Sequence, residues 1–475
     1  MRFLKWICGE MERPYYPEPE DVPTHPIESN ASILRETSSV NYGGIRFSIS
    51  DTPPIFRGET TQEIAEAIKL FDDKESPIFI TGNAGTGKST LLRYLRRRRP
   101  TNLAVLAPTG IAAVNIGAET IHSFFRFPPR LLQERSIEIH KDRVGMYSVL
   151  ETIIVDEISM VRADLLDAID VSLRLHRSSN EPFGGVQMVL IGDICQLPPV
   201  VTRDLEEYFS HFYPTPYFFS AKAIASGALQ VVELTKVFRQ KDPNYVDILN
   251  KIRRNRLDRS TLESINGRAV THGLADLADD TTVLTTTNKA ADQINWRKLA
   301  AIPTSPVRFH AQIEGDFKKD LFPADDPLVL KKGARVMMLK NNGSDWQNGT
   351  VGVVERFDDT DVIVLLNGRS CRVERQRWSV VQYRYDRKAR RVYEVEVGSF
   401  TQFPMRLAWA ITIHKSQGQT LQKIAVDLGS GAFAHGQVYV ALSRCPSLEG
   451  VTLTRPLRTS DICFDPRVLS IESKS

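Results

Sequence analysis

One short stretch limits what this chain can fold into more than any other: GNAGTGKS, from Gly82 to Ser89. It matches the pattern G-x-x-x-x-G-K-[ST], follows the apolar run PIFIT, and precedes a sequence of helical character. In this pattern the glycines let backbone N–H groups wrap the phosphates of a nucleotide, and the helix that follows adds a favourable dipole. Lys88 is predicted to act in catalysis by reaching the β- and γ-phosphates, and the Ser89 hydroxyl to bind Mg²⁺. The stretch therefore predicts a parallel α/β sheet that binds a nucleotide with Mg²⁺.

ATP is the predicted nucleotide. The guanine-specific pattern N-K-x-D is nearly present at NKAAD, Asn288 to Asp292, but it is one residue too long and lies in a second α/β unit. Gln62 precedes the loop at a position where a side-chain amide reads both edges of adenine; an exposed helix glutamine is the alternative. The other predicted ATP-binding residues are Gly82, Asn83, Ala84, Gly85, Thr86, Gly87, Lys88, Ser89 and Thr90.

Two further apolar runs end in polar residues that suit hydrolysis. IIVDEISM brings Asp156 to the magnesium ion and places Glu157 to polarise the attacking water as a general base. IGDICQLPPV places Gln196 where a γ-phosphate or water can be hydrogen-bonded. Arg239 in TKVFRQ and Arg444 in YVALSRC carry permanent planar charges that suit phosphoryl transfer, although spacing alone leaves each open as a surface charge.

Apolar runs that alternate with helical stretches organise most of the chain into two α/β units. Runs such as LAVLAPTG and QMVLIGD are typical of buried strands in a doubly wound parallel sheet, which binds ligands beyond the carboxyl ends of its strands. A second unit begins after about Leu234. Within it, residues 345–403 alternate with a period of two and carry hairpin signals at Asn348-Gly349 and Asn367-Gly368, which predicts a small antiparallel barrel. Residues 1–54 are proline-rich and are predicted to form an extended arm.

The composition disfavours several other classes of protein. Hydrophobic residues make up 42% and charged residues 25%, as in soluble globular proteins, and there is no apolar run long enough to predict a membrane span. The five cysteines lie far apart without a C-x-x-C pair, which disfavours a zinc site or a disulfide framework. Early acidic residues argue against a transit peptide, so a bacterial or viral cytoplasm is the default location, with the nucleus or mitochondrion expected for a eukaryotic source.

The set of motifs resembles that of superfamily 1 helicases and, within them, the Pif (petite integration frequency) family. The resemblance rests on GNAGTGKST, APTGIAAVNIGAETIHSFF, IIVDEISM, GDICQLPPV, LTKVFRQKDPNYVDILNKIR, ITIHKSQGQTL and VYVALSR, which follow the family's order between Thr60 and Leu453. It implies two RecA-like domains that hydrolyse ATP between them and move along single-stranded DNA from 5′ to 3′. It also implies an SH3-like form for the insertion, catalytic roles for Gln196, Arg239 and Arg444, and adenine contact by Gln62.

The expected domains follow from these boundaries. They are an N-terminal arm at 1–54, a first RecA-like domain at 55–233, and a second at 234–475 that the SH3-like insertion at 345–403 interrupts. The resemblance also places a short wedge, which splits the duplex, near 123–150. That segment is compact and basic here, but the sequence does not indicate which residue separates the strands.

The predicted DNA contacts of the first domain lie in strand-end segments away from the nucleotide. Thr109 and Gly110 in APTG, and Thr120 and His122 in ETIHSFF, offer hydroxyl, backbone and imidazole donors to phosphates without reading sequence. Phe124 is predicted to stack on a base, which tolerates any sequence, with a place in the hydrophobic core as the alternative.

The stretch ITIHKSQGQT is predicted to hold the same DNA strand from the second domain. It begins with β-branched residues and then turns polar, so that Thr412, His414, Ser416 and Gln417 offer short donors at close spacing. We expect His414 and Ser416 to face DNA and residues Gln417 to Gln419 to lie nearer the path that couples DNA binding to the ATP cleft. The run Arg96 to Arg99 also suggests a DNA patch, but a cap at the C-terminal end of the helix that follows the phosphate-binding loop is favoured, because cations are stabilised there.

The leading hypothesis is an ATP-dependent 5′-to-3′ DNA helicase that uses ATP and Mg²⁺. The expected partners are single-stranded, forked or structured DNA and, by resemblance, RNA–DNA hybrids, for a monomer or weak oligomer without a membrane partner. The resemblance also implies roles in DNA repair, recombination and telomere maintenance. Two alternatives stay open: a translocase that displaces bound proteins without separating strands, and a nucleotide-switched binding protein with little turnover. The complete catalytic set argues against the switch.

Overall fold

The computed structural model describes residues 39–42, 45–48, 61–99, 101–225, 229–342, 345–358 and 361–471. The chain divides into two compact units, Met1–Arg57 and Gly58–Ser475. In the first unit, β1 (Ser39–Tyr42) and β2 (Ile45–Ser48) pair antiparallel, and the rest of the predicted arm lies outside the described residues. Within the described part of the chain, no helix combines the length and the apolar character that crossing a membrane requires.

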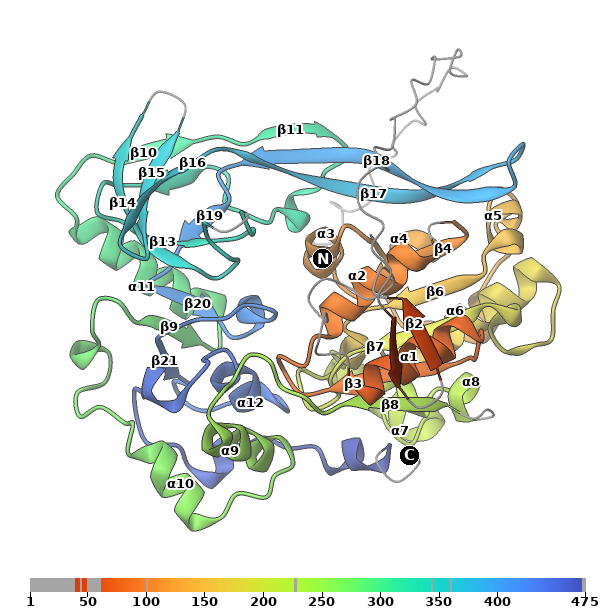
Figure 1. Ribbon diagram of the computed structural model, residues 1–475, viewed down its shortest axis with the longest axis horizontal. Helices are drawn as coiled ribbons and strands as arrows, with labels where there is room; N and C mark the ends of the chain where they lie inside the picture. The colour runs from red at the N-terminus through yellow and green to blue at the C-terminus, as the bar shows by residue number, and fades with distance from the viewer. Residues whose placement is uncertain are drawn as a thin grey trace, which may run out of the picture. The chain divides into compact units, whose positions relative to one another are not determined.

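The first α/β domain of the second unit is built on a six-stranded sheet of order β5-β4-β6-β7-β3-β8, in which all neighbours are parallel (Figure 1). Its strands are β3 (Ile78–Gly82), β4 (Leu103–Ala107), β5 (Glu119–Thr120), β6 (Thr152–Val155), β7 (Gln187–Ile191) and β8 (Gln230–Leu234). Its helices are α1 (Gln62–Asp72), α2 (Lys88–Arg98), α3 (Gly110–Ile116), α4 (Ile121–Phe125), α5 (Val144–Val149), α6 (Ala163–Arg177), α7 (Arg203–Phe212) and α8 (Lys222–Ala225). The prediction of a doubly wound parallel sheet is confirmed.

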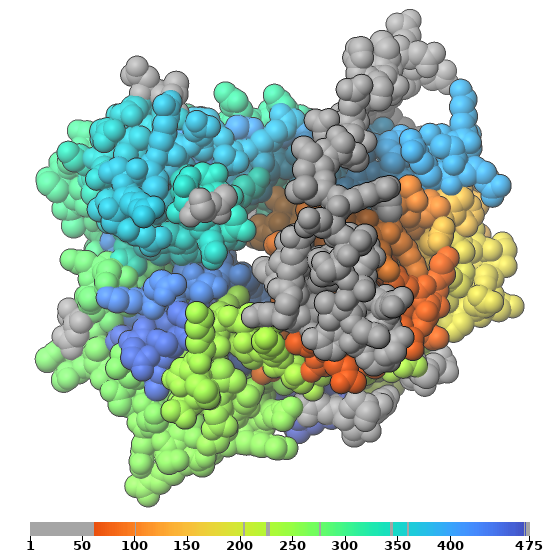
Figure 2. Space-filling model, in the orientation of Figure 1, coloured from red at the N-terminus to blue at the C-terminus, as the bar shows by residue number. Residues whose placement is uncertain are grey.

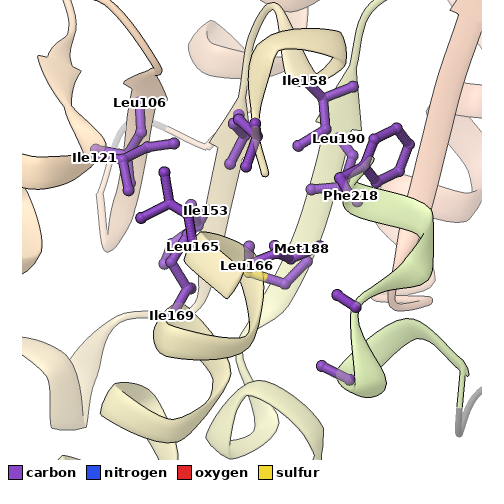
Figure 3. Close-up of a cluster of buried hydrophobic side chains, with 14 of the residues drawn as sticks. Leu106, Ile121, Ile153, Ile158, Leu165, Leu166, Ile169, Met188, Leu190 and Phe218 are labelled. Atoms are coloured by element: carbon purple, nitrogen blue, oxygen red, sulfur yellow. The ribbon is translucent and has the colours of Figure 1, made fainter. Parts of the chain in front are cut away.

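The core of this domain lies between the sheet and α6. Figure 3 shows Leu165 of α6 beside Ile153 of β6, and Leu166 beside Met188 of β7. Each such side chain stabilises the fold by about 1.5–3 kcal/mol when it leaves water. Because these contacts fix β6 and β7, they also fix the polar residues that follow the carboxyl ends of those strands.

The second α/β domain has a four-stranded parallel sheet of order β20-β9-β21-β22. Its strands are β9 (Thr282–Thr285), β20 (Ala410–Thr412), β21 (Ile424–Asp427) and β22 (Val451–Leu453), and its helices are α9 (Pro243–Arg253), α10 (Arg259–Asn266), α11 (Asn288–Ala301) and α12 (Gln437–Leu442). A separate hydrophobic cluster, which includes Leu284, Val426 and Val440, forms its core. The predicted second α/β unit is confirmed.

Antiparallel strands interrupt the second domain between β9 and β20, as predicted. They form sheets of order β16-β15-β14-β13-β19, β11-β18-β17 and β10-β12. The strands are β10 (Val307–Phe309), β11 (Gln312–Gly315), β12 (Leu328–Leu330), β13 (Arg335–Met338), β14 (Val351–Phe357), β15 (Val362–Leu366), β16 (Arg369–Val373), β17 (Gln376–Asp386), β18 (Arg391–Gln402) and β19 (Met405–Leu407). These strands extend beyond the predicted limits 345–403 on both sides. The sequence did not indicate the outer strands, because each contains only three or four residues and shows little alternation. Closure of the five-stranded sheet into an SH3-like barrel stays a prediction.

The two predicted hairpin turns differ in outcome. Asn367 and Gly368 join β15 directly to β16 with φ values of 51° and 78°, which fits the favoured two-residue turn. Asn348 and Gly349 instead lie in the connection 339–350 between β13 and β14, where only Gly349 of the pair has a positive φ, 95°. A turn does form there, since the N–H of Thr350 donates to the carbonyl oxygen of Gln347 at 3.0 Å, but it lies inside a longer connection and does not join β13 directly to β14 as the hairpin prediction expected.

Candidate active site

The loop after β3 has a conformation that its glycines permit. Gly82 (φ 143°) and Gly85 (φ 87°) have backbone angles that residues with a side chain rarely adopt. A Cβ atom at Gly82 would lie 2.4 Å from the carbonyl oxygen of Leu234, and one at Gly85 would lie 2.6 Å from Cβ of Arg239. The glycines therefore also allow the end of β8 and Arg239 to lie directly against the loop.

Lys88 begins α2, and its ammonium group folds back onto the loop. Nζ donates to the carbonyl oxygens of Gly82 at 2.6 Å and Asn83 at 2.8 Å. Burial lowers the pKa of Lys88, and the nearby carboxylates of Asp193 and Glu157 oppose that effect. These partners of the ammonium group are neutral carbonyls, which phosphate oxygens can replace.

Two carboxylates follow β6 in the position predicted for hydrolysis. Burial raises the pKa of Asp156, and burial followed by the charge of Asp156 raises the pKa of Glu157 to about 7. Glu157 also has a φ of 50°, a left-handed conformation that is uncommon outside glycine and that often marks a functional site. A half-buried carboxylate of raised pKa suits the acceptance of a proton from water, which is compatible with the predicted role of Glu157 as a general base.

Asp193, which follows β7, joins the two domains and was missed by the sequence-based prediction. Its Oδ1 accepts a hydrogen bond from Nε of Arg253 at 3.3 Å, and its Oδ2 accepts from Nε2 of Gln196 at 3.2 Å and from the hydroxyl of Tyr439 at 3.1 Å. Burial alone would raise the pKa of Asp193, but Arg253 and Lys88 lower it. The predicted residue Gln196 is therefore held by an ionised carboxylate that second-domain side chains also contact.

Tyr439 of α12 brings the second domain onto the phosphate-binding loop. Its hydroxyl accepts from the backbone N–H of Ala84 at 3.0 Å and donates to Asp193. Beside it, Nδ2 of Asn83 donates to Oδ1 of Asn250 at 2.7 Å. Tyr439 and Asn250 lie inside the motifs VYVALSR and LTKVFRQKDPNYVDILNKIR, and this position was the only sequence feature that pointed to a functional role for them. Their roles stayed hidden because Tyr439 and Ala84 are 355 positions apart.

Arg239 and Arg444 lie together at this junction. Arg444 is fully buried and donates to the carbonyl oxygens of Val440 at 2.9 Å and Ser416 at 3.3 Å and to Oγ of Ser443 at 2.8 Å. Arg239 donates to the carbonyl oxygen of Ser443 at 3.1 Å. Burial, followed by the charge of Arg239, lowers the pKa of Arg444 to about 9. Arg444 is buried and Arg239 is half-buried, and both have neutral hydrogen-bond partners here, so phosphate groups would stabilise this region.

The start of α1 lies near the same loop. Gln62 is exposed, and its neighbour Glu63 accepts a hydrogen bond from Oγ1 of Thr235 at 2.6 Å. A hollow of about 500 Å³ opens beside the loop, lined by Asn83, Glu233, Leu234, Thr235, Asp247, Asn250, Lys251, Arg254 and Arg256. Its place suits the remainder of a nucleotide, but Gln62 is not among its lining residues, so the adenine contact stays a prediction.

The predicted DNA residues of the first domain lie at the starts of α3 and α4. Oγ1 of Thr109 accepts from the N–H of Ala112, and Oγ1 of Thr120 caps α4 in the same way. His122 follows in α4 and is half-buried. Gly110 is half-buried and lies against Leu321, which stands between β11 and β12, since a Cβ atom at Gly110 would lie 2.0 Å from Cδ2 of Leu321. Contact between the backbone of Gly110 and a phosphate stays a prediction.

Phe124 does not belong to this surface. Its side chain is fully buried, and its ring lies 4.9 Å from Phe125, 5.5 Å from Tyr147 and 5.6 Å from Tyr383, centroid to centroid. Stacking on a base needs an exposed ring face. The predicted DNA contact of Phe124 is therefore wrong, and the core alternative is correct.

The stretch ITIHKSQGQT divides differently from the prediction. His414 is exposed, in agreement with a role at the surface. Ser416 is fully buried; its Oγ donates to the carbonyl oxygen of Ile413 at 2.7 Å, and its own carbonyl accepts from Arg444. Ser416 therefore belongs to the buried contacts around Arg444, next to the proposed ATP site, and the prediction that its side chain contacts DNA is wrong.

A second hollow lies beside Thr412, at the end of β20. Its lining residues are Asn288, Ala291, Asp292, Asn295, Trp296, Asp325, Arg406, Leu407, Ala410, Ile411, Thr412 and Lys415. Trp296 is 55% exposed, and Nε of Arg406 is buried without a hydrogen-bond partner among the described residues. Gln417 is half-buried, and its Nε2 is likewise unpaired within the described chain. Sequence reasoning missed Trp296 and Arg406 because neither lies in a recognisable motif.

The basic run at 96–99 has structural roles. Arg96 donates to the carbonyl oxygen of Ile116 at 2.9 Å, at the end of α3. Arg99 donates to the carbonyl oxygen of Phe71 at 2.6 Å, at the end of α1. Arg96, Arg97 and Arg98 do lie in the last turn of α2, where cations are favoured, but the carbonyls that Arg96 and Arg99 cap belong to α3 and α1, so the prediction that the run caps α2 is wrong for these two arginines.

A phosphate-binding loop on one parallel α/β domain, completed by arginines and a tyrosine from a second such domain, defines a two-domain RecA-like P-loop NTPase. A family model described as PIF1-like helicase matches residues 58–260. The chain belongs to this family. It is 32% identical over 436 residues to the ATP-dependent DNA helicase Pif1 of Bdellovibrio bacteriovorus, a match that covers 89% of this chain and 93% of that protein.

Eukaryotic relatives are longer. The ATP-dependent DNA helicase PIF1 of Homo sapiens is 33% identical over 438 residues, which cover 89% of this chain and 64% of that protein. The chain thus spans less than two thirds of the length of this relative, and of the relative from Emericella nidulans, for which the share is 61%.

A solved relative exists in several states. Unliganded Pif1 from a Bacteroides species is 37% identical, matches with a TM-score of 0.81, and covers 87% of this chain and 96% of that one. The same Bacteroides Pif1 bound to ssDNA, at equal identity and coverage, gives a TM-score of 0.61. The complex of Bacteroides Pif1 with ADP-AlF4 gives a TM-score of 0.80, so the arrangement of this chain is closer to the DNA-free forms of the relative than to its ssDNA-bound form.

Proposed function

We propose that this chain is an ATP-dependent DNA helicase that moves 5′ to 3′ along single-stranded DNA and separates duplex or structured DNA. The observation that carries the proposal is the contact of the second domain with the phosphate-binding loop, where Tyr439 meets Ala84 and Arg239 lies against Gly85. A nucleotide that enters this junction must displace or join such contacts, so binding and hydrolysis change how the domains meet. Membership of the PIF1-like helicase family supports DNA as the track and supports the direction.

In the proposed reaction, a water oxygen bonds to the γ-phosphorus while the bond to the bridging oxygen breaks and ADP leaves with the electron pair. Glu157 takes the proton of the water, and Gln196 holds the water or the γ-phosphate by a hydrogen bond. Lys88, Arg239 and Arg444 neutralise the charge that spreads over the phosphate oxygens. Hydrogen bonds already hold these three cations in place, so little reorganisation is required when this charge develops.

Mg²⁺ is proposed to bind the hydroxyl of Ser89 and the carboxylate of Asp156. This oxygen-only pair fits Mg²⁺, which keeps several waters and takes further oxygens from the substrate's phosphates. The charge of Asp156 acts on Lys88, the neighbour of Ser89, so the two ligands lie in one region. The described residues contain no group of three or more His, Cys, Asp or Glu side chains that would offer another metal site. When bound, the ion neutralises charge on the β- and γ-phosphates.

The DNA track is proposed to cross both domains. Thr109, Thr120 and His122 would hold the strand in the first domain, and His414 would hold it in the second. Thr412 is only 4% exposed and its Oγ1 accepts from the N–H of Lys415, so its DNA contact stays a prediction. Because the nucleotide would bind where the two domains meet, each ATP cycle would change the distance between the DNA-binding residues of the two domains. This change would move the protein along the strand.

The finer assignments are also proposals. We retain the domain limits 1–54, 55–233 and 234–475 and a wedge near 123–150, but the insertion is extended from 345–403 to the strands β10 to β19. RNA–DNA hybrids as additional tracks, a monomer or weak oligomer on DNA, and a location in a bacterial or viral cytoplasm or a eukaryotic nucleus or mitochondrion rest on the family resemblance alone.

The proposal predicts ATP hydrolysis that rises strongly when single-stranded DNA is added and that stops when Mg²⁺ is chelated. It also predicts unwinding of forks that carry a 5′ tail. Both are measured with purified protein, by phosphate release and by separation of a labelled strand. A rate independent of DNA, or unwinding only from 3′ tails, would contradict the proposal. DNA-stimulated hydrolysis without strand separation on either fork would favour the translocase.

Trp296 is expected to stack on a base of the bound strand. The tryptophans at 346, 378 and 409 are 5%, 3% and 9% exposed, whereas Trp296 is 55% exposed beside Thr412 and Lys415. In a Trp6→Phe background, single-stranded DNA should quench tryptophan fluorescence, and Trp296→Phe should remove the quenching. Trp296→Ala should weaken binding by about 5- to 150-fold, since stacking contributes about 1–3 kcal/mol per base.

The matched control for this experiment is Phe433→Ala, which removes another exposed aromatic ring and should leave DNA affinity unchanged. Quenching that persists after Trp296→Phe would show that DNA passes elsewhere.

A further inference from the structure

The longest strands of the described chain, β17 and β18, form an antiparallel hairpin of 11 and 12 residues. At its base, β18 pairs with β11 of the insertion. Its far end reaches the first domain and lies beside α5, as Figure 1 shows and as contacts of α5 with both strands confirm. Figure 2 shows the surface of this far end against the first domain. By chain order the hairpin belongs to the second domain, but its far end is built into the first.

Tyr383 of β17 anchors the far end. Its side chain is 1% exposed and belongs to the first domain's core cluster together with Phe124. Its hydroxyl accepts from the N–H of Val105 at 2.8 Å and donates to Oε1 of Glu394 at 3.2 Å. Strand β4 needs this acceptor because its neighbour β5 has only two residues and leaves part of the edge open. A side chain of the insertion therefore completes the edge of the first domain's sheet.

The backbone of Tyr383 holds a buried carboxylate next to the proposed DNA contacts. Its N–H donates to Oε2 of Glu119 at 2.9 Å, and Oγ of Ser123 donates to Oε1 of Glu119 at 2.6 Å. Glu119 is 3% exposed, and a buried carboxylate is costly without such partners. It directly precedes Thr120, which caps α4, and α4 carries His122. The hairpin thus fixes the start of the helix that is proposed to hold DNA.

Two further contacts seat the far end, and the first of them involves neither the Tyr383 hydroxyl nor its partner Glu394. The N–H of Val392 donates to Oδ1 of Asn102 at 3.1 Å, and Arg96 pairs with Glu394 at 2.6 Å. We therefore expect the hairpin to stay attached when the Tyr383 hydroxyl is removed. The effect of this removal on the position of α4 can then be measured in a folded protein.

An irregularity separates the two ends of the hairpin. The pairing register shifts between Val380 and Val381, opposite Gly398. The base is packed closely in the insertion, since a Cβ atom at Gly398 would lie 2.7 Å from the carbonyl carbon of Asp316. Bulges bend a strand locally. The bulge therefore lies between a base held in the insertion and a far end held in the first domain.

We propose that Tyr383 is a positioning residue for DNA binding: from the insertion of the second domain it fixes the start of α4 through Glu119, so that the first domain's grip on single-stranded DNA depends on a seated hairpin. The inference rests on the proposed function, because Thr120 and His122 are proposed contacts. The bulge lets the base of the hairpin follow the second domain while the far end keeps its place. Tyr383 touches no residue assigned above to ATP.

The test uses the full chain with Tyr383→Phe, which removes only the hydroxyl, and Glu119→Gln, which weakens the acceptor at the start of α4. The single-stranded DNA concentration for half-maximal ATPase stimulation should rise about tenfold in each. The DNA-free rate and the KM for ATP should stay unchanged, and amide exchange over residues 103–125 should become faster. Tyr393→Phe is the matched control, because its ring lies on β18 of the same hairpin and is 42% exposed.

The outcomes separate the inference from the function. A wild-type protein without DNA stimulation would refute the proposed function, and the inference with it. Normal stimulation in the wild type, with an unchanged DNA requirement in both variants, would overturn the inference alone. An equal loss of the DNA-free and DNA-stimulated rates would also overturn the inference, because it indicates general destabilisation of the protein. A stronger affinity for DNA would overturn it as well, because the Tyr383 contacts would then hinder DNA binding rather than support it.

Discussion

Replacement of Lys88 by alanine is expected to abolish ATP hydrolysis while leaving part of the binding to single-stranded DNA. The ammonium group of Lys88 lies at the loop with only neutral carbonyls as hydrogen-bond partners, ready to receive phosphate oxygens. Loss of one preorganised donor to developing charge costs about 100- to 1,000-fold in rate, and here a full charge is lost as well. The proposed DNA contacts lie on other strand ends, so the DNA affinity measured by fluorescence anisotropy should largely survive.

Lys74→Ala is the matched control for this substitution. Lys74 lies in the same domain, but its side chain is 60% exposed and pairs with Glu151 at the surface, where an ion pair contributes little. The control should hydrolyse ATP at the wild-type rate. An equal loss of hydrolysis and DNA binding in a folded Lys88→Ala protein would contradict the separation of the two sites.

The phosphate-binding loop could be predicted from the sequence because its chemistry is local. Lys88 bonds to carbonyls only five and six positions before it, and the glycines act through their own backbone angles. The strand ends at Asp156 and Gln196 were likewise predicted, because apolar runs that end in polar residues define both the strands and the edge of the sheet at which ligands bind.

Burial could not be predicted where it depends on distant segments. Phe124 and Ser416 were both assigned to the DNA surface from their local sequence. Phe124 is covered by Tyr383, whose backbone bonds to a residue 264 positions away, and Ser416 is covered by Arg444, 28 positions away. Period and composition indicate the type of an element, but they do not indicate which other element packs on it.

The same limit applies to the contacts between domains. Alternation with a period of two predicts strands such as β17 and β18, but not that their far end completes the sheet of the first domain. Asp193 and Tyr439 lie inside quoted motifs, yet their hydrogen bond joins residues 246 positions apart. The contacts that join ATP to domain movement are therefore the ones that required the structure.

Replacement of Arg444 by lysine is expected to reduce DNA-stimulated ATP hydrolysis by about 1,000-fold or more, the scale of an arginine that stabilises phosphoryl transfer. Lysine keeps the charge but loses the planar group, which here donates to Val440, Ser416 and Ser443 at once. The rate should be measured in a single turnover with DNA saturating, so that chemistry is separated from product release. Affinity for an ATP analogue should fall far less than the rate, because Lys88 and the loop still hold the phosphates.

Arg259→Lys is the control for Arg444→Lys, since Arg259 is 93% exposed and pairs only with Glu263 on α10. Thermal melting of both variants tests whether the lost hydrogen bonds unfold the second domain. A folded Arg444→Lys protein with wild-type turnover would show that Arg444 is structural and that Arg239 alone supplies the charge. A loss confined to turnover would instead support a site assembled from both domains, because Arg444 contacts the first domain's nucleotide only when the two domains meet.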